Sequence, residues 1–184
     1  MRRLSGVLVL AMLAVVLQAA APGVADAAVR RPCPVGWGSL HERSGATSGA
    51  PITDIRAGHH RCFDRLVIEV DGDELGYRVQ YVHRLRQDGS GLPVSVDGGA
   101  ILRVVALGPA YDDDGMATVD PDVLDEPDLS RYRTFRDLVW AGSFEGQTTL
   151  GIGVRARLPF RVFALDGPDG GTRLVVDVAH RWRR

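Results

Sequence analysis

The chain has 184 residues, 45% of them hydrophobic and 24% charged, which suits a single domain with its own core and excludes a disordered chain. All 22 basic residues are arginine, and the net charge of −1 gives no reason to expect a nucleic acid partner. The absence of lysine excludes Schiff-base chemistry, a P-loop lysine and a catalytic Ser-Lys pair.

Residues 1–27 have the pattern of a secretory signal peptide. Arg2 and Arg3 precede an apolar run over residues 7–17, and small residues then offer a cleavage site between Ala27 and Ala28. A run of 11 residues is too short to anchor the chain, because a bilayer span takes roughly 20. We therefore expect a secreted protein without a membrane span after cleavage. The twin arginine leaves Sec and Tat export both open.

Two cysteines follow the signal, Cys33 and Cys62. Two cysteines in an exported protein are expected to pair, which would tie the N-terminal segment to the first predicted strand. A catalytic thiol and a metal site with His59 and His60 are the alternatives. Neither cysteine lies in a catalytic motif, and the five histidines show no metal-ligand spacing, so we predict no metal and no cofactor.

The rest of the chain reads as short strands. Residues 28–36 form an N-terminal extension, and the segment up to residue 55 reads as a loosely structured entry. Apolar alternation or short apolar runs, separated by turns rich in Gly and Pro, then predict seven strands: 63–70, 77–82, 101–107, 137–144, 148–154, 160–165 and 173–178. No segment has helical periodicity. The pattern predicts an all-β fold, a compact antiparallel β-sandwich of two small sheets over residues 37–184.

Residues 111–128 interrupt the strands with eight acidic residues and no basic one. Calcium binding is one reading, since hard cations take several carboxylate oxygens, but the EF-hand spacing is absent. We expect a long, solvated, mobile loop.

Two sequence echoes connect the halves of the chain. Arg65-Leu66-Val67-Ile68-Glu69-Val70 is similar to residues 173–178, and Tyr77-Arg78-Val79 is similar to residues 160–162. Pseudo-symmetric sheets or chance repetition of a β-pattern both explain this. Gly151-Ile152-Gly153 is too short to indicate more than a turn or close sheet packing.

Several motifs together resemble the AMIN-like domain of secreted actinobacterial proteins. They run in order over residues 37–180: Trp37-Gly38-Ser39-Leu40, residues 56–67 with Phe63-Asp64-Arg65, Gly76-Tyr77, residues 89–94, residues 142–146 with Phe144-Glu145-Gly146, and residues 173–178. The family usually has a small residue where Cys62 lies, which favours a disulfide particular to a subset of its members.

The resemblance implies a β-sandwich that associates with the cell wall or with another envelope protein and has no catalysis of its own. Expected partners are therefore peptidoglycan glycan or peptide, or an envelope protein, at an extracytoplasmic, wall-associated location. A wall hydrolase using His60 or Asp64 with Glu145 is an alternative, and a small-ligand carrier using the interior between the sheets is another.

Five residues are the candidate binding patch: His60, Asp64, Arg65, Phe144 and Glu145. The alternation places Arg65 on the face opposite Leu66 and Ile68, and Glu145 at a turn between two strands. These residues form either an Arg–carboxylate pair that fixes the sandwich edge or a polar patch that contacts a wall fragment or partner.

Overall fold

In a computed structural model of the protein, the described residues are Cys33, 36–125, 127–167 and 170–183. The predicted signal peptide, its cleavage site and most of the N-terminal extension lie outside them. From Cys33 to Arg184 the chain forms one compact unit. Its elements are β1 (Glu42–Ser44), β2 (Ile52–His59), β3 (Phe63–Val70), β4 (Tyr77–Val82), β5 (Leu85–Arg86), β6 (Pro93–Val94), β7 (Ala100–Ala106), η1 (Pro121–Leu124), η2 (Leu129–Arg131), β8 (Phe135–Phe144), β9 (Gln147–Val154), β10 (Phe160–Asp166) and β11 (Thr172–Ala179).

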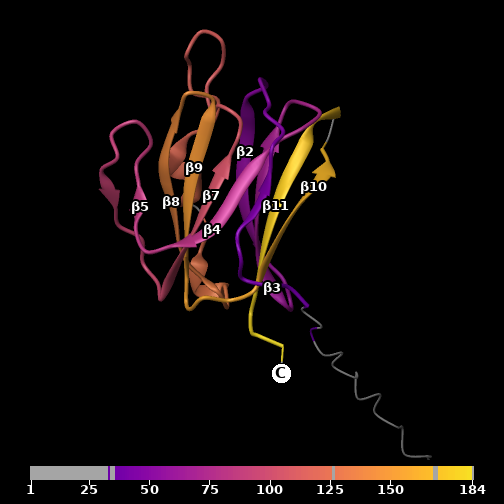
Figure 1. Ribbon diagram of the computed structural model, residues 1–184, viewed down its shortest axis with the longest axis vertical. Helices are drawn as coiled ribbons and strands as arrows, with labels where there is room; N and C mark the ends of the chain where they lie inside the picture. Colours follow the sequence, from indigo (N-terminus) through magenta and orange to yellow (C-terminus); the bar gives the residue numbers. More distant parts are fainter. Residues whose placement is uncertain (1–32, 34–35, 126, 168–169, 184) are drawn as a thin grey trace, which may run out of the picture. The chain divides into compact units, whose positions relative to one another are not determined.

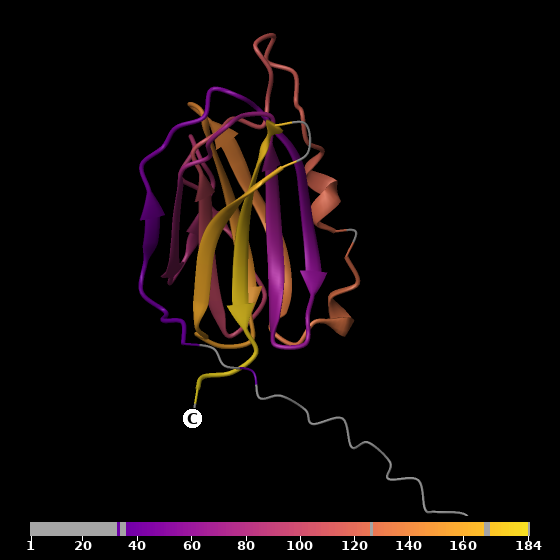
Figure 2. The same cartoon turned by 90° about the vertical axis from the view of Figure 1, so that its right-hand side faces the viewer.

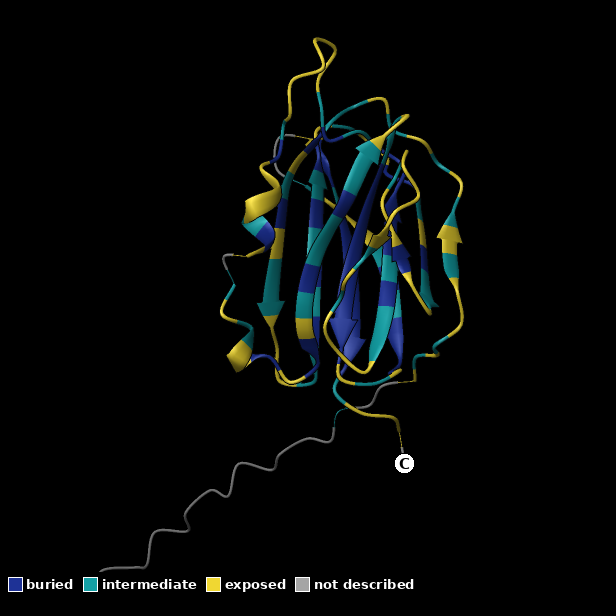
Figure 3. Ribbon diagram, turned by 90° about the vertical axis from the view of Figure 1, so that its left-hand side faces the viewer, coloured by how far each residue is buried: buried dark blue, intermediate teal, exposed yellow. Residues whose placement is uncertain are grey.

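These strands form the predicted β-sandwich. A five-stranded sheet in the order β1-β4-β7-β9-β8 faces a four-stranded sheet in the order β10-β11-β3-β2, and every pairing is antiparallel (Figure 1). All seven predicted strands are present, as β3, β4 and β7 to β11. Buried residues alternate with more exposed ones along β3, whereas β9 and β11 are buried on both faces (Figure 3). The inner faces meet in one core, whose largest buried side chains include Phe135 and Phe160.

Strand β2 was not predicted, because its apolar spacing is irregular. Ile52 and Ile55 are both fully buried although they are three residues apart, and the register against β3 shifts between Ile52 and Asp54. A β-bulge adds one residue to a strand, so side chains three positions apart point to the same face. The bulge therefore hides the period of two that identifies the other strands.

Two segments close the open sides of the sandwich (Figure 2). On one side, the segment around β1 pairs with β4 and reaches β10, where the Phe160 N–H donates to the carbonyl of Gly38 at 2.8 Å and the Val162 N–H donates to the Glu42 carboxylate at 3.0 Å. Burial raises the pKa of Glu42. On the other side, η1 and η2 pack against β2 and β8.

The acidic segment is mostly exposed, as expected of a solvated loop, but part of it is fixed to the sandwich. Its apolar residues Val119 and Leu124 belong to the core, whereas carboxylates organise its turns. Asp120 and Asp128 cap η1 and η2 by accepting from N–H groups two residues on, as N-cap residues do. Among the described residues, no three His, Cys, Asp or Glu side chains are grouped so that they could hold a metal ion.

The hairpin of β5 and β6 packs on the outside of the five-stranded sheet, over β9. Leu85 is fully buried there, and a Cβ on Gly151 would lie 2.5 Å from its Cδ2. A Cβ on Gly153 would lie 1.9 Å from the carbonyl oxygen of Asp97, which no side chain allows. The two glycines of residues 151–153 therefore serve close packing, one of the two readings of this motif.

Candidate functional site: an arginine–aromatic cluster

Arg65, Asp177 and Arg161 lie side by side across the outer face of the four-stranded sheet. The register pairs Arg65 of β3 with Asp177 of β11, and Asp177 with Arg161 of β10. The Asp177 side chain is fully buried and accepts from Nε and Nη2 of Arg65 at 2.6 and 2.9 Å. It also accepts from Nε and Nη2 of Arg161 at 2.9 and 2.7 Å. One carboxylate thus fixes two guanidinium groups.

Aromatic rings enclose both guanidinium groups. The Cζ of Arg161 lies 4.4 Å from the ring centre of Trp37 and 4.7 Å from that of Phe163, and the Cζ of Arg65 lies 5.1 Å from that of Phe63. These are cation–π distances. Trp37 comes from the residues just before β1, so the segment that closes this side of the sandwich also contributes to the cluster. We call Trp37, Phe63, Arg65, Arg161, Phe163 and Asp177 the arginine–aromatic cluster.

His60 extends the cluster at the β2–β3 turn. Its ring stacks on Phe63, with 4.6 Å between the ring centres. Burial lowers the pKa of His60, and the positive charge of Arg65 lowers it further, so His60 is neutral at pH 7. It therefore adds a fourth ring surface and no charge.

The chemistry of the cluster suits a ligand that carries a negatively charged group close to an apolar ring face. Two guanidinium charges share one carboxylate, which leaves the group with one net positive charge. The side chains of Arg65 and Arg161 are 22% and 40% exposed, and their Nη1 groups make no hydrogen bond to a described residue. A guanidinium can donate further N–H groups to a carboxylate, while the solvent-facing parts of the half-buried rings can stack on an apolar ring face.

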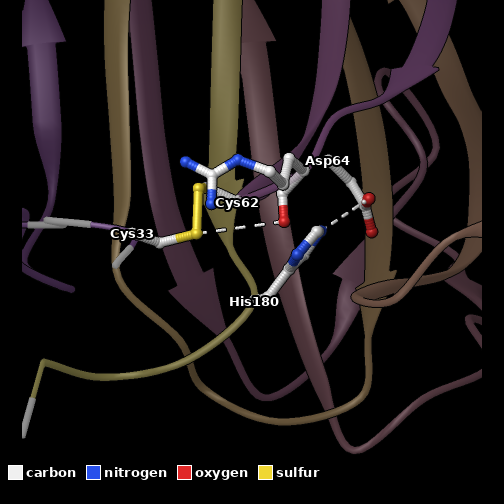
Figure 4. Close-up of a disulfide and its surroundings, with 5 residues drawn as sticks. Cys33, Cys62, Asp64 and His180 are labelled. Carbon is white, nitrogen blue, oxygen red and sulfur yellow. Dashed lines mark hydrogen bonds and ion pairs between the residues drawn. A yellow bond between two sulfur atoms is a disulfide. The ribbon is translucent and has the colours of Figure 1, made fainter. Parts of the chain in front are cut away.

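Asp64 precedes Arg65 in β3 and lies on the inner face of that strand, where it links three segments of the chain. Its fully buried carboxylate accepts from the N–H groups of Thr134 and Phe135 at 2.5 and 3.1 Å and contacts Nε2 of His180 at 3.0 Å (Figure 4). Burial alone would raise the pKa of Asp64, but the bonds from His180, Thr134 and Phe135 outweigh it and lower the pKa. Among the described residues, no hydroxyl or thiol is hydrogen-bonded to His180, so this pair has the geometry of a structural clamp.

The predicted disulfide between Cys33 and Cys62 is confirmed. The two Cα atoms are 5.4 Å apart, and the bond joins the start of the described chain to the β2–β3 turn. The N–H of His180 donates to the carbonyl of Cys62 at 3.0 Å, so the disulfide lies beside the Asp64–His180 clamp (Figure 4).

Removing the disulfide is expected to destabilise the fold without abolishing it. The bond closes a loop with a sequence separation of 29, for which loop-closure entropy gives about 3.5 kcal/mol. Urea unfolding of a Cys33→Ser/Cys62→Ser variant measures this loss. An unchanged midpoint would mean that the bond does not constrain the unfolded chain.

The five residues of the predicted patch do not form one surface. His60 and Arg65 meet at the arginine–aromatic cluster, whereas Asp64 is buried beneath it. Asp64 binds the start of β8, and Phe144 ends that ten-residue strand, about 30 Å away at 3.3 Å per residue. Glu145 follows at the β8–β9 turn. The carboxylate partner of Arg65 is thus Asp177, and the suggested pairing of Glu145 with His60 or Asp64 has no geometric basis.

Sequence reasoning missed Asp177, Arg161, Trp37 and Phe163 as members of the site. The sequence similarity between residues 65–70 and 173–178 could have indicated that these two segments are neighbouring strands. The two segments pair antiparallel in one sheet, so Arg65 lies opposite Asp177 and Arg173 opposite Glu69. The interpretation that each sheet holds one such strand is wrong, and between the sheets the buried side chains of the described residues pack as one core.

A half-open groove of about 380 Å³ lies where the ends of β4 and β7 meet the β6–β7 and β9–β10 loops. Residues of β4 and β7 line it together with Arg157, whose guanidinium lies 5.0 Å from the ring centre of Tyr81. Both hydrogen-bonding functions of the Tyr81 hydroxyl are used by the backbone of Leu158, at 2.8 and 3.0 Å. These bonds serve the packing of the β9–β10 loop.

Comparison with known proteins identifies the family. The family model of the AMIN-like domain matches residues 50–180, which include β2 to β11 and every cluster residue except Trp37. A search of curated proteins gives no match. AMIN-like domains are cell-envelope modules and are generally non-catalytic, and the family and the disulfide together indicate an extracytoplasmic protein. No helix in the described part of the chain has the length and apolarity to cross a membrane. The chain belongs to the AMIN-like domain family.

Proposed function

We propose that this protein is a non-catalytic module of the cell envelope that binds peptidoglycan at the arginine–aromatic cluster. The observation that supports this most is the pair of guanidinium groups held by one buried carboxylate between half-buried rings. The pair is fixed before any ligand arrives, so little side-chain entropy is lost on binding.

Peptidoglycan offers both of the groups that this cluster suits. Its sugars have apolar ring faces that stack on aromatic side chains, and its peptide stems carry carboxylates. In the proposed complex a sugar lies against Trp37, and a stem carboxylate accepts from the Nη1 groups of Arg161 and Arg65. The cluster lies on an outer sheet face, where a polymer strand can pass without entering a pocket.

The proposal includes export, since peptidoglycan lies outside the cytoplasm. A disulfide is typical of that compartment. Removal of residues 1–27 by cleavage between Ala27 and Ala28 stays a prediction, because these residues lie outside the described ones.

An Arg161→Gln variant tests the site. Sedimentation with purified peptidoglycan is expected to show at least about ten-fold weaker binding, the effect of losing an interface arginine that contributes 1.4 kcal/mol or more. The fold is expected to persist, because Asp177 keeps its two bonds from Arg65. Trp37→Ala is expected to weaken binding similarly.

Arg43→Gln is the matched control, since Arg43 is an exposed arginine of β1 on the five-stranded sheet. It is expected to bind as the unsubstituted protein does. If folded Arg161→Gln and Trp37→Ala variants sediment with peptidoglycan as strongly as the control, the cluster is not the contact. Capture of an envelope protein in place of peptidoglycan would then be the competing function.

A further inference from the structure

Six exposed arginines gather at one end of the sandwich, the end where the C-terminus lies (Figures 1 and 2). They come from three segments: the start of β8 with the residues just before it, the β9–β10 loop and the C-terminal tail. We call them the arginine end: Arg133, Arg136, Arg155, Arg157, Arg181 and Arg183.

Hydrogen bonds to the backbone hold these segments together. Nη2 of Arg136 donates to the carbonyl of Arg133 at 3.2 Å, the Arg155 N–H donates to Thr134 at 2.9 Å, and the Arg155 guanidinium donates to the carbonyl of His180. None of the six forms an ion pair with a described carboxylate. Nearby carboxylates are engaged elsewhere, Asp64 with His180 and Asp137 with the N–H of Asp97. The six arginines outnumber the carboxylates of Asp64, Asp97 and Asp137 near them, so this end has a net positive charge.

The opposite end carries the opposite charge. The described loops there are the β3–β4 loop, the projecting loop after β7 and the β8–β9 turn, and they contain no arginine (Figure 1). Their carboxylates are Asp71, Asp73, Glu74, Asp112, Asp113, Asp114 and Glu145. Because the whole chain has a net charge of only −1, its long-range field comes mainly from this separation of charge between the two ends.

An exposed tryptophan lies within the arginine end. The Trp182 side chain is 48% exposed between Arg181 and Arg183, and its Nε1–H donates to the carbonyl of Arg157 at 3.1 Å. With its polar atom bound to the protein, the indole offers its apolar ring to the surroundings. Tryptophan beside arginine is typical of surfaces that meet the headgroup region of a membrane. The described chain also begins at this end, at Cys33 beside the β2–β3 turn.

We propose that the arginine end docks on a membrane surface rich in anionic phospholipids. The guanidinium groups bind lipid phosphates, and Trp182 enters the headgroup layer. The anionic lipids repel the carboxylates of the other end. The sandwich is therefore oriented with its arginine end on the membrane and its acidic end pointing away from it. Arginine suits this role because its planar guanidinium donates two parallel hydrogen bonds to a phosphate.

Vesicle sedimentation of residues 28–184 tests the proposal. This piece contains the compact unit and all the residues of its core, so it is expected to fold without the residues before it. We expect it to bind vesicles of phosphatidylcholine mixed with phosphatidylglycerol, and to bind pure phosphatidylcholine vesicles far more weakly. Arg181→Gln/Arg183→Gln is expected to lower the partition coefficient about 30-fold, about five-fold for each arginine near an anionic surface. Neither side chain makes a hydrogen bond to a described residue, so the fold is expected to persist.

Arg43→Gln/Arg78→Gln is the matched control, because it removes the same charge from two exposed arginines that face each other across β1 and β4. Its partition coefficient is expected to stay within about two-fold of the unsubstituted value. Equal losses in the two double variants would overturn the proposal, since binding would then follow net charge rather than the arginine end. Equal binding to vesicles with and without phosphatidylglycerol would also overturn it, and so would low-salt self-association in place of vesicle binding.

Discussion

Replacing Asp64 with alanine is expected to lower the free energy of unfolding by about 3–5 kcal/mol. The change leaves the buried N–H groups of Thr134 and Phe135 without an acceptor and removes the partner of His180. These groups come from the entry to β8 and the end of β11, so the loss loosens the contact between the two sheets. Urea denaturation followed by circular dichroism measures the change, and a loss below about 1 kcal/mol would contradict the clamp.

The same carboxylate gives the protein a specific acid sensitivity. Its folded-state pKa is lowered, so its contribution is complete above the unfolded value, about pH 4, and is lost as the pH falls through the folded value. Asp64→Asn is the control, because it keeps the shape and cannot titrate. We expect the stability of the unsubstituted protein to fall more steeply below about pH 4 than that of Asp64→Asn. Parallel slopes would mean that Asp64 does not carry this sensitivity.

Replacing Asp177 with alanine is expected to cost about 2–4 kcal/mol, because two neighbouring guanidinium groups lose their only shared carboxylate. The cost stays below that of a fully buried pair, since both arginines reach solvent. Thermal or urea unfolding measures it. Unfolding at the same midpoint as the unsubstituted protein would show that the pair of arginines needs no counter-charge.

A triple variant separates stability from binding at this cluster. Arg65→Met/Arg161→Met/Asp177→Leu replaces the charged row by apolar side chains of similar volume, which is often neutral for stability. It is expected to unfold near the midpoint of the unsubstituted protein and to lose peptidoglycan binding. Retained binding in this folded variant would contradict the proposed role of the guanidinium groups.

The two-sheet fold could be predicted because most strands expose one face and bury the other. Residues 63–70 and 77–82 alternate cleanly, and the structure has strands over those residues. The bulge near Ile52 broke that alternation, so β2 was missed. The anchoring of the acidic segment was not predicted, because its charged residues greatly outnumber Val119 and Leu124, the two that enter the core.

The site was harder to predict than the fold, since it depends on sheet order. Arg65 was selected correctly as a residue that pairs with a carboxylate, but its partner lies 112 positions away on a neighbouring strand. Trp37 reaches Arg161 only because the segment around β1 spans the side of the sandwich, with Gly38 beside Phe160 of β10 and β1 beside β4. Phe144 and Glu145 follow a motif of the family, yet the length of β8 carries them to the far end of the sandwich.

Sedimentation of residues 28–184 with purified peptidoglycan, with the released muropeptides measured in the same tube, tests the central claim most directly. A soluble domain of similar size and charge serves as the control. The account predicts that the protein sediments with peptidoglycan, that the control stays in solution, and that no muropeptide is released. Protein that stays in solution would contradict peptidoglycan binding, and released muropeptides would contradict a non-catalytic module.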